Sequence, residues 1–161
     1  MTEMFLKLEP KKGKIEGEAL DAAHLGEIEV HGWGWGVSNT ADLTTTKDLY
    51  KSTTVDEVVI KKGIDKASLI LMGYCARGER IKKATLTCRK NDRGAKLAYL
   101  VIELDNVKVM DVDWSDGEHV MSETVKLKCV QSKATYKRQL NSGAGKGHTH
   151  FGYDISTHEA I

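Results

Sequence analysis

The second half of the chain alternates apolar and polar residues with a period of two. Between residues 81 and 90, Ala84, Leu86 and Cys88 occupy every second position. Successive side chains of a β-strand point to opposite faces, so this alternation predicts a strand with one apolar face. Turn-forming sequences follow at 91–94 (Asn-Asp-Arg-Gly) and at 116–117 (Asp-Gly). This half of the chain is therefore predicted to be β-structure.

The apolar phase slips once within the long strand region at 97–114. Leu100, Ile102 and Leu104 share one face, but after two polar positions the apolar set restarts at Val107. A strand keeps its phase unless an extra residue or a sharp change of direction interrupts it. The slip therefore predicts a bulge or a bend near residues 105–106.

Residues 65–77 form the one good helix candidate. Asp65 is a suitable N-cap, and Gly78 is placed to end the helix. An apolar stripe follows spacings of three and four. It consists of Ala67, Ile70, Leu71, Tyr74 and Cys75.

Many strands, repeated turns and one helix predict a mainly β fold, a compact barrel or sandwich with one flanking α-helix. The 161 residues suit a single domain, 1–161. Within it, residues 38–53 contain five threonines and no proline and show no sustained period. We expect an extended loop or arm there, with Leu43, Leu49 and Tyr50 as possible anchors.

Residues 25–37 contain two tryptophans that alternate with glycines. Read as one strand, this segment places Ile28, Val30 and the glycines on one face. Trp33 and Trp35 then lie on the opposite face, against either the core or another subunit. A carbohydrate-binding platform is an alternative use of such paired aromatic side chains.

Composition narrows the functional classes. Lys and Arg number 24 and Asp and Glu 23, a net charge of +1, which counts against a protein that binds nucleic acid through phosphate charge. No apolar run is long enough to cross a membrane, and the first residues do not resemble a signal peptide. Three cysteines without a Cys-x-x-Cys pair predict free thiols in the cytoplasm.

Residues 142–149 resemble a phosphate-binding loop only in part. That motif requires a glycine at position 140, where the chain has Leu140, and Lys146 is followed by Gly147 instead of Ser or Thr. We therefore interpret the segment as a hairpin loop and expect no nucleotide cofactor.

Two clusters have metal-binding residue types but incomplete patterns. The histidines lack a fourth ligand, and the acidic cluster lacks the spacing of a calcium loop, so both are expected to be solvated. The histidines are His148, His150 and His158, and the acidic residues are Asp111, Asp113 and Asp116.

The three cysteines are the candidate nucleophiles. Cys88 and Cys129 take the apolar phase of strands, and Cys75 lies on the apolar stripe of the helix. Free cysteine is commonly a small buried hydrophobic residue. We therefore expect no catalytic cysteine and no enzyme.

An ordered set of segments resembles the Hcp (haemolysin-coregulated protein) family, whose members form the inner tube of the bacterial type VI secretion system. It covers nearly the whole chain, and no single motif is diagnostic. The segments are 4–7 (MFLK), 17–18 (GE), 24–28 (HLGEI), 32–36 (GWGWG), 65–68 (DKAS), 81–90 (IKKATLTCRK), 99–109, 123–127 (ETVKL) and 151–155 (FGYDI).

The resemblance implies a structural subunit. Relatives close six copies into a ring, and the rings stack into a tube that a contracting sheath drives outwards. A spike caps the tube, and small effectors ride in its lumen. It implies synthesis in the cytoplasm and export by the machine without a signal peptide. Candidate contacts between copies are Trp33, Trp35, Leu43, Leu49 and Tyr50. The alternative is a monomeric β-sandwich that binds carbohydrate through Trp33 and Trp35.

Overall fold

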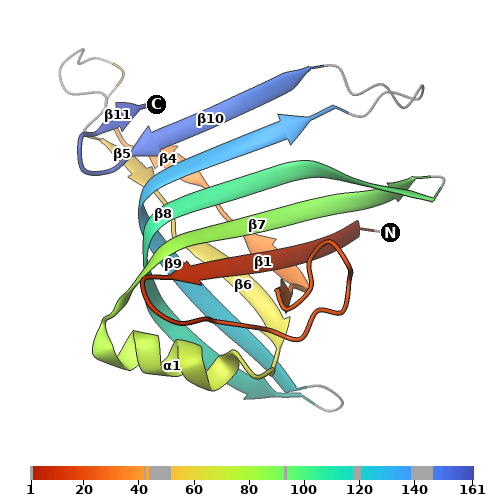
Figure 1. The fold of residues 1–161 in the computed structure, drawn as a ribbon. Coiled ribbons are helices and arrows are strands. Elements are labelled where there is room, and N and C mark those ends of the chain that lie inside the picture. Colours follow the sequence, from red (N-terminus) through yellow and green to blue (C-terminus); the bar gives the residue numbers. More distant parts are fainter. Residues whose placement is uncertain (1, 42, 44–51, 93, 118–120, 139–146) are drawn as a thin grey trace.

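A computed structural model describes residues 2–41, 43, 52–92, 94–117, 121–138 and 147–161 (Figure 1). It is mainly β, with one helix among the described residues. The elements are β1 (Thr2–Pro10), β2 (Ile28–Glu29), β3 (Gly32–Gly34), β4 (Val37–Asn39), β5 (Thr53–Val55), β6 (Val58–Gly63), α1 (Ser68–Arg77), β7 (Arg80–Asp92), β8 (Ala95–Asp116), β9 (Met121–Lys137), β10 (His148–Asp154) and β11 (Glu159–Ala160).

Nine of the strands form one antiparallel sheet that folds over itself. Its main order is β11-β10-β9-β8-β7-β1-β2, while β6 joins β9 and β3 joins β6. The first half of β9 pairs with β6 (Val58 opposite Leu127), and its second half pairs with β10 (Phe151 opposite Ala134). The long strands β8 and β9 therefore run through both layers of the fold, the one that contains β6 and the one that contains β10. The result is a sandwich-like fold, and the sheet does not close into a barrel.

The fold-over point lies where the apolar phase of the sequence slips. Asn106 adopts a left-handed backbone conformation, with φ of 55°. A second irregularity follows in the β8–β9 register between Val109 and Asp111. Leu104, Val107 and Val109 are all buried despite the slip. The predicted bulge or bend is confirmed, because it lets the strand keep its apolar residues inside while it changes layer.

The core lies between the two layers and under α1. Cys88 and Cys129 are buried in it, as the alternation predicted. Burial raises the pKa of the Cys129 thiol to about 11, so this side chain is a neutral thiol at pH 7. Cys75 is half-buried against the same core.

The helix begins at Ser68, so the predicted start at Asp65 is wrong by three residues. Asp65 instead closes a turn before the helix, because its carboxylate accepts the Ala67 N–H at 3.0 Å and its carbonyl accepts the Ser68 N–H at 3.1 Å. The predicted stop is confirmed, since Gly78 has φ of 65° beyond the last turn. The apolar stripe is narrower than expected, because Ile70 is exposed.

Among the described residues, no helix is long and apolar enough to span a membrane.

A buried ion pair fixes the start of α1 to both strands beneath it. Lys62 of β6 donates to Glu123 of β9 at 2.7 Å, to Asp65 at 2.9 Å and to the Ser68 hydroxyl at 3.1 Å. The second oxygen of Glu123 accepts the Trp114 indole N–H at 2.6 Å. The side chains of Lys62 and Glu123 are both fully buried. Such a pair requires partners for each charge, because an unpaired buried charge is costly.

We predict that Lys62→Met destabilises the subunit by about 3–5 kcal/mol, because it leaves the Glu123 carboxylate buried without its cation. The double variant Lys62→Met/Glu123→Leu should recover most of this loss, since it removes both charges together. Urea unfolding monitored by circular dichroism measures both free energies of unfolding.

Lys83→Met is the matched control. Lys83 pairs with Glu103 at 3.4 Å at the surface, so its loss should cost less than about 1 kcal/mol. A double variant as unstable as Lys62→Met would contradict the prediction.

Candidate subunit interface

The tryptophan segment carries the chain from one layer to the other. The Val30 N–H donates to the Met4 carbonyl at 3.0 Å, and the next residue, His31, donates its N–H to the Lys61 carbonyl at 2.8 Å. The backbone therefore leaves β1 and joins β6 within one residue. The expected single strand over 25–37 is wrong, because the segment divides into β2, β3 and β4, each with a different partner.

Trp33 and Trp35 are half-buried and pack against the core. Because the layer change resets the alternation, they do not lie opposite the buried Val30 as a single strand would require. Trp35 also makes an edge contact with Phe151 of β10, with ring centroids 5.9 Å apart. The Trp35 indole nitrogen is buried and has no hydrogen-bond partner in the described part of the chain. Both rings thus belong to the packing of the subunit, and their role between copies stays a prediction.

The arm expected at 38–53 has a paired base. Residues 37–39 (β4) and 53–55 (β5) form a two-stranded sheet separate from the main one. The pairing extends one step further, because the Thr40 N–H donates to the Ser52 carbonyl at 3.2 Å. Pairing thus reaches into both ends of the segment, as far as Thr40 and Ser52, and the extended arm at about 38–53 stays a prediction. Figure 1 shows this small sheet above the layer that contains β6.

Of the three anchors expected in the arm, the structure describes Leu43 alone. Leu43 is fully exposed. Leu49 and Tyr50 lie outside the described residues. Their part in contacts between copies stays a prediction.

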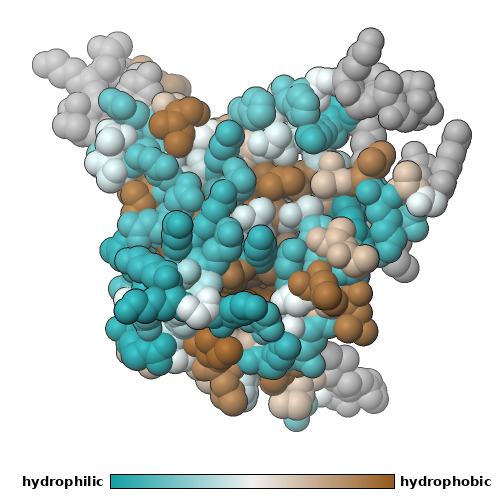
Figure 2. Space-filling model, viewed as in Figure 1, coloured by the Kyte–Doolittle hydropathy of each residue, from teal (hydrophilic) through white to brown (hydrophobic). Residues whose placement is uncertain are grey.

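Sequence reasoning missed a set of exposed leucines on the loop after β1 and on α1. Leu20, Leu25 and Leu69 are 85%, 71% and 70% exposed. Figure 2 shows apolar side chains lying among hydrophilic ones on the face that carries this loop and α1. Single exposed leucines are common at protein surfaces, so these three mark a contact surface only if they lie together in one apolar patch. The sequence does contain an indication of these leucines: Leu69 lies outside the apolar stripe of the helix, and Leu20 and Leu25 are apolar residues within a polar loop.

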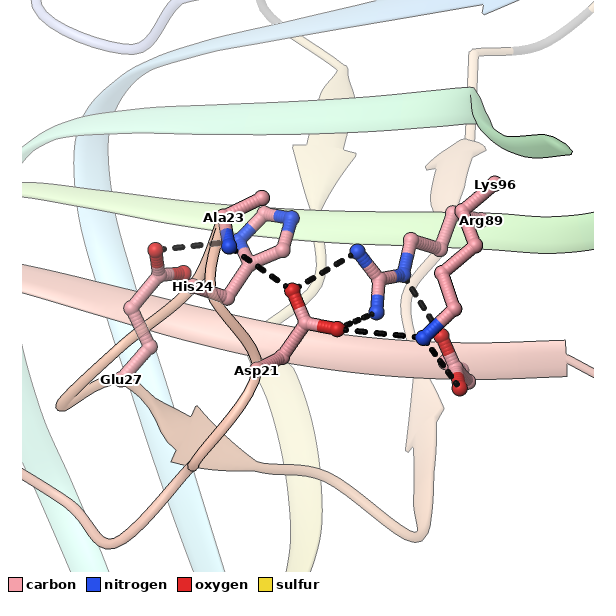
Figure 3. A network of polar contacts seen from close by, with 7 residues as sticks. Asp21, Ala23, His24, Glu27, Arg89 and Lys96 are labelled. Carbon is pink, nitrogen blue, oxygen red and sulfur yellow. Dashed lines mark hydrogen bonds and ion pairs between the residues drawn. The ribbon is translucent and has the colours of Figure 1, made fainter.

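A polar network holds this loop against the sheet (Figure 3). Arg89 of β7 is buried and makes two hydrogen bonds to the Asp21 carboxylate, one of them at 3.0 Å. It also donates to Glu3 at 2.6 Å, and Lys96 donates to Asp21 at 3.3 Å. The hydrogen bonds from Arg89 hold the pKa of Asp21 well below its usual value.

An aromatic stack completes the attachment of the loop. The Phe5 ring contacts two side chains: the Arg89 guanidinium is 4.8 Å from its centroid, and the His24 ring stacks on it with ring centroids 4.4 Å apart. His24 in turn contacts the Glu27 carboxylate at 3.0 Å. Asp21 and His24, which make these contacts, are the sequence neighbours of Leu20 and Leu25. They therefore fix the backbone from which both exposed leucines project.

The described residues of the other candidate sites, the histidine cluster and the acidic cluster, do not come together to form a binding site. Rings of His148 and His150 stack 6.1 Å apart on an exposed stretch of β10. The part of the chain that the structure describes contains no group of three or more metal-ligating side chains. Asp111 is exposed and pairs with Lys126 at 3.9 Å. Most of the loop at 142–149 lies outside the described residues.

Comparison with known proteins identifies relatives along almost the whole chain. The family model described as "Type VI secretion system effector, Hcp" matches residues 5–136. Protein Hcp1 of Pseudomonas aeruginosa is 32% identical over 148 residues, which cover 90% of this chain and 89% of that protein.

Solved structures agree in fold. Hcp1 from Salmonella typhimurium superposes with a TM-score of 0.78 at 32% identity and covers 99% of each chain. A type VI secretion system effector from Yersinia pestis has a TM-score of 0.74 at 29% identity, over 94% of this chain and 99% of that one.

We predict that Asp21 stabilises the subunit in a pH-dependent way. Its pKa is lowered on folding, so its contribution is fully present above the usual value of 3.8 and is lost as the pH falls below it. The difference in free energy of unfolding between the wild type and Asp21→Asn should therefore be larger at pH 7 than at pH 3. Urea unfolding at both pH values measures it.

Asp111→Asn serves as the control, because its exposed ion pair should contribute little at either pH. The prediction fails if the Asp21→Asn difference is the same at pH 7 and pH 3.

Proposed function

The chain belongs to the Hcp family of type VI secretion tube proteins, and from this we propose that it is the structural subunit of a secretion tube. In this proposal six copies close into a ring, and the rings stack. The match to Hcp1 from Salmonella typhimurium, which covers 99% of the chain, supports the proposal. A near-neutral net charge of +1 supports it, because like-charged copies would repel one another.

A ring needs two different patches that meet between neighbours. We propose the loop leucines Leu20 and Leu25 as one patch, because the Arg89 network holds their backbone in place. The half-buried Trp33 and Trp35, together with the arm residues Leu43, Leu49 and Tyr50, are the proposed contacts elsewhere in the ring or stack. Pairing between copies would also extend the main sheet at its end strands β2 and β11.

The remaining partners follow from the proposed tube. A contractile sheath would drive it outwards, a spike would cap it, and effector proteins would travel in its lumen. The subunit would be made in the cytoplasm and exported by the machine. It would need no catalysis and no cofactor.

We predict hexamers for the purified chain. Size-exclusion chromatography with light scattering should give six times the subunit mass of 17.8 kDa, and negative-stain electron microscopy should reveal rings. Leu20→Asp/Leu25→Asp should shift the protein towards the monomer, because each charged side chain would have to be buried in the contact. A strict monomer at high concentration would refute the proposal.

Deletion of residues 40–52 should weaken the stacking of rings far more than it weakens the subunit. The reason is that the β4–β5 pair lies outside the main sheet, so the core loses no strand. Electron microscopy counts stacked rings, and thermal unfolding reports on the subunit. In a second variant, Gly and Ser replace residues 40–52, so the chain length is unchanged. Comparing it with the deletion distinguishes the effect of losing the arm's side chains from the effect of shortening the chain. Unfolding of the deleted subunit would instead assign the arm to the core.

The alternative, a monomeric carbohydrate-binding module, makes a different prediction. A glycan screen would detect binding that disappears in Trp33→Ala or Trp35→Ala while the fold survives. The packing of both rings against the core favours the tube subunit, since each half-buried ring leaves only part of its surface to receive a sugar.

A further inference from the structure

Three cations lie side by side across three neighbouring strands. Arg80 of β7 is directly opposite Lys108 of β8, and Lys108 is directly opposite Lys128 of β9. Directly opposed residues of antiparallel strands point to the same face, with Cβ atoms about 5 Å apart. All three are exposed, while the adjacent pair Ile81 and Val107 is buried. Arg80, Lys108 and Lys128 therefore form one cationic row on the outer face of the sheet.

The cationic row has no carboxylate partner among the described residues. Its one side-chain contact is a hydrogen bond from Arg80 to the Asn106 amide oxygen at 3.1 Å. Other surface lysines on the same strands are paired, as Lys83 is with Glu103 and Lys126 with Asp111. Like charges placed directly opposite one another destabilise a sheet. The row is thus an unfavourable arrangement in the isolated subunit.

Two carboxylates near the row, those of Glu79 and Asp154, are engaged elsewhere, while Asp56 and Glu57 line a second hollow that also includes Lys128. Glu79, next to Arg80, pairs with Arg77 at 3.0 Å. Asp154 accepts hydrogen bonds from Gln131 and from the Ser156 hydroxyl, both at 2.6 Å. Neither is available to neutralise the row without breaking an existing contact.

The row borders a hollow in the surface of about 380 Å³. The turn after β10 forms one wall, held by a hydrogen bond from the Ile155 N–H to the Val130 carbonyl at 2.8 Å. Met110 and Val130 add apolar surface, and no Asp or Glu lines the hollow. Its volume lies in the range of small-molecule sites. The hollow therefore combines three cations with an apolar wall and no opposing charge.

We propose that this hollow binds a phosphate group, either as the free ion or as a phosphomonoester. A phosphate dianion offers several acceptor oxygens, which suits donors arriving from three strands. The guanidinium of Arg80 provides a planar donor pair, and the two lysines provide point charges. The strand register fixes the backbone of all three residues before the ligand arrives, so binding has to order only their long side chains. The proposal is independent of tube assembly.

Isothermal titration calorimetry of the full chain tests the proposal. One arm uses inorganic phosphate and the other phenyl phosphate, both at pH 7.5 and at an ionic strength held constant with sodium chloride. We expect saturable binding of one phosphate per subunit. Equal affinity for both probes identifies the phosphate group alone as the recognised element, and tighter binding of phenyl phosphate adds a contribution from the apolar wall.

Lys108→Gln, at the centre of the row, should weaken binding by about tenfold or more, the usual effect of losing one charge-assisted hydrogen bond. Lys108→Arg should retain binding. Lys133→Gln is the matched control, because Lys133 is an exposed lysine of β9 that does not line the hollow. In chloride alone, Lys108→Gln should unfold at the same or a higher temperature than the wild type, since it removes like-charge repulsion.

Three results would overturn the proposal. The first is heat that does not saturate, which would indicate general ion effects. The second is an equal loss of binding in Lys108→Gln and Lys133→Gln, which would indicate surface charge alone. The third is the absence of phosphate binding together with a salt-sensitive loss of self-association in Lys108→Gln, which would make the row a contact between copies.

Discussion

The structure depends on the bend of two long strands. β8 has 22 residues and β9 has 17, and their pairing runs through both layers. Because they remain hydrogen-bonded to each other through the bend, a single sheet supplies both walls of the core. The left-handed Asn106 and the register shift after Val109 allow this change of direction while the apolar side chains stay inside. Within the main sheet, β7 pairs with β8, and β6 and β10 pair with β9.

Two polar networks attach the non-strand segments to that framework. The buried Lys62–Glu123 pair joins the start of α1 to β6 and β9, whose paired residues are 61 positions apart in the chain. Arg89 attaches the loop after β1 to β7 through Asp21, 68 positions away. The Arg89 network thereby holds against β7 the loop that carries the exposed Leu20 and Leu25.

The sequence predicted the framework better than the surface. Alternation and turn residues located the strands of the second half, the bend near Asn106 and the buried Cys88 and Cys129. The tryptophan segment was misread as one strand, because a change of layer between Val30 and His31 leaves no mark on a single-strand pattern. The exposed leucines and the row formed by Arg80, Lys108 and Lys128 were missed. Each of these residues is of a common type for its own segment. Only the three-dimensional arrangement shows which residues lie beside it.

By itself, the sequence determined properties that depend on neighbouring residues. Side-chain alternation defined strands, and Gly78 ended the helix, because these features follow from local backbone geometry. The tertiary structure alone decided which distant residues meet. It brought Lys62 to Glu123, Arg89 to Asp21 and Lys108 between two other cations. The reason is register: a shift of one residue between two strands turns every side chain to the opposite face, and register is set by the packing of the whole sheet.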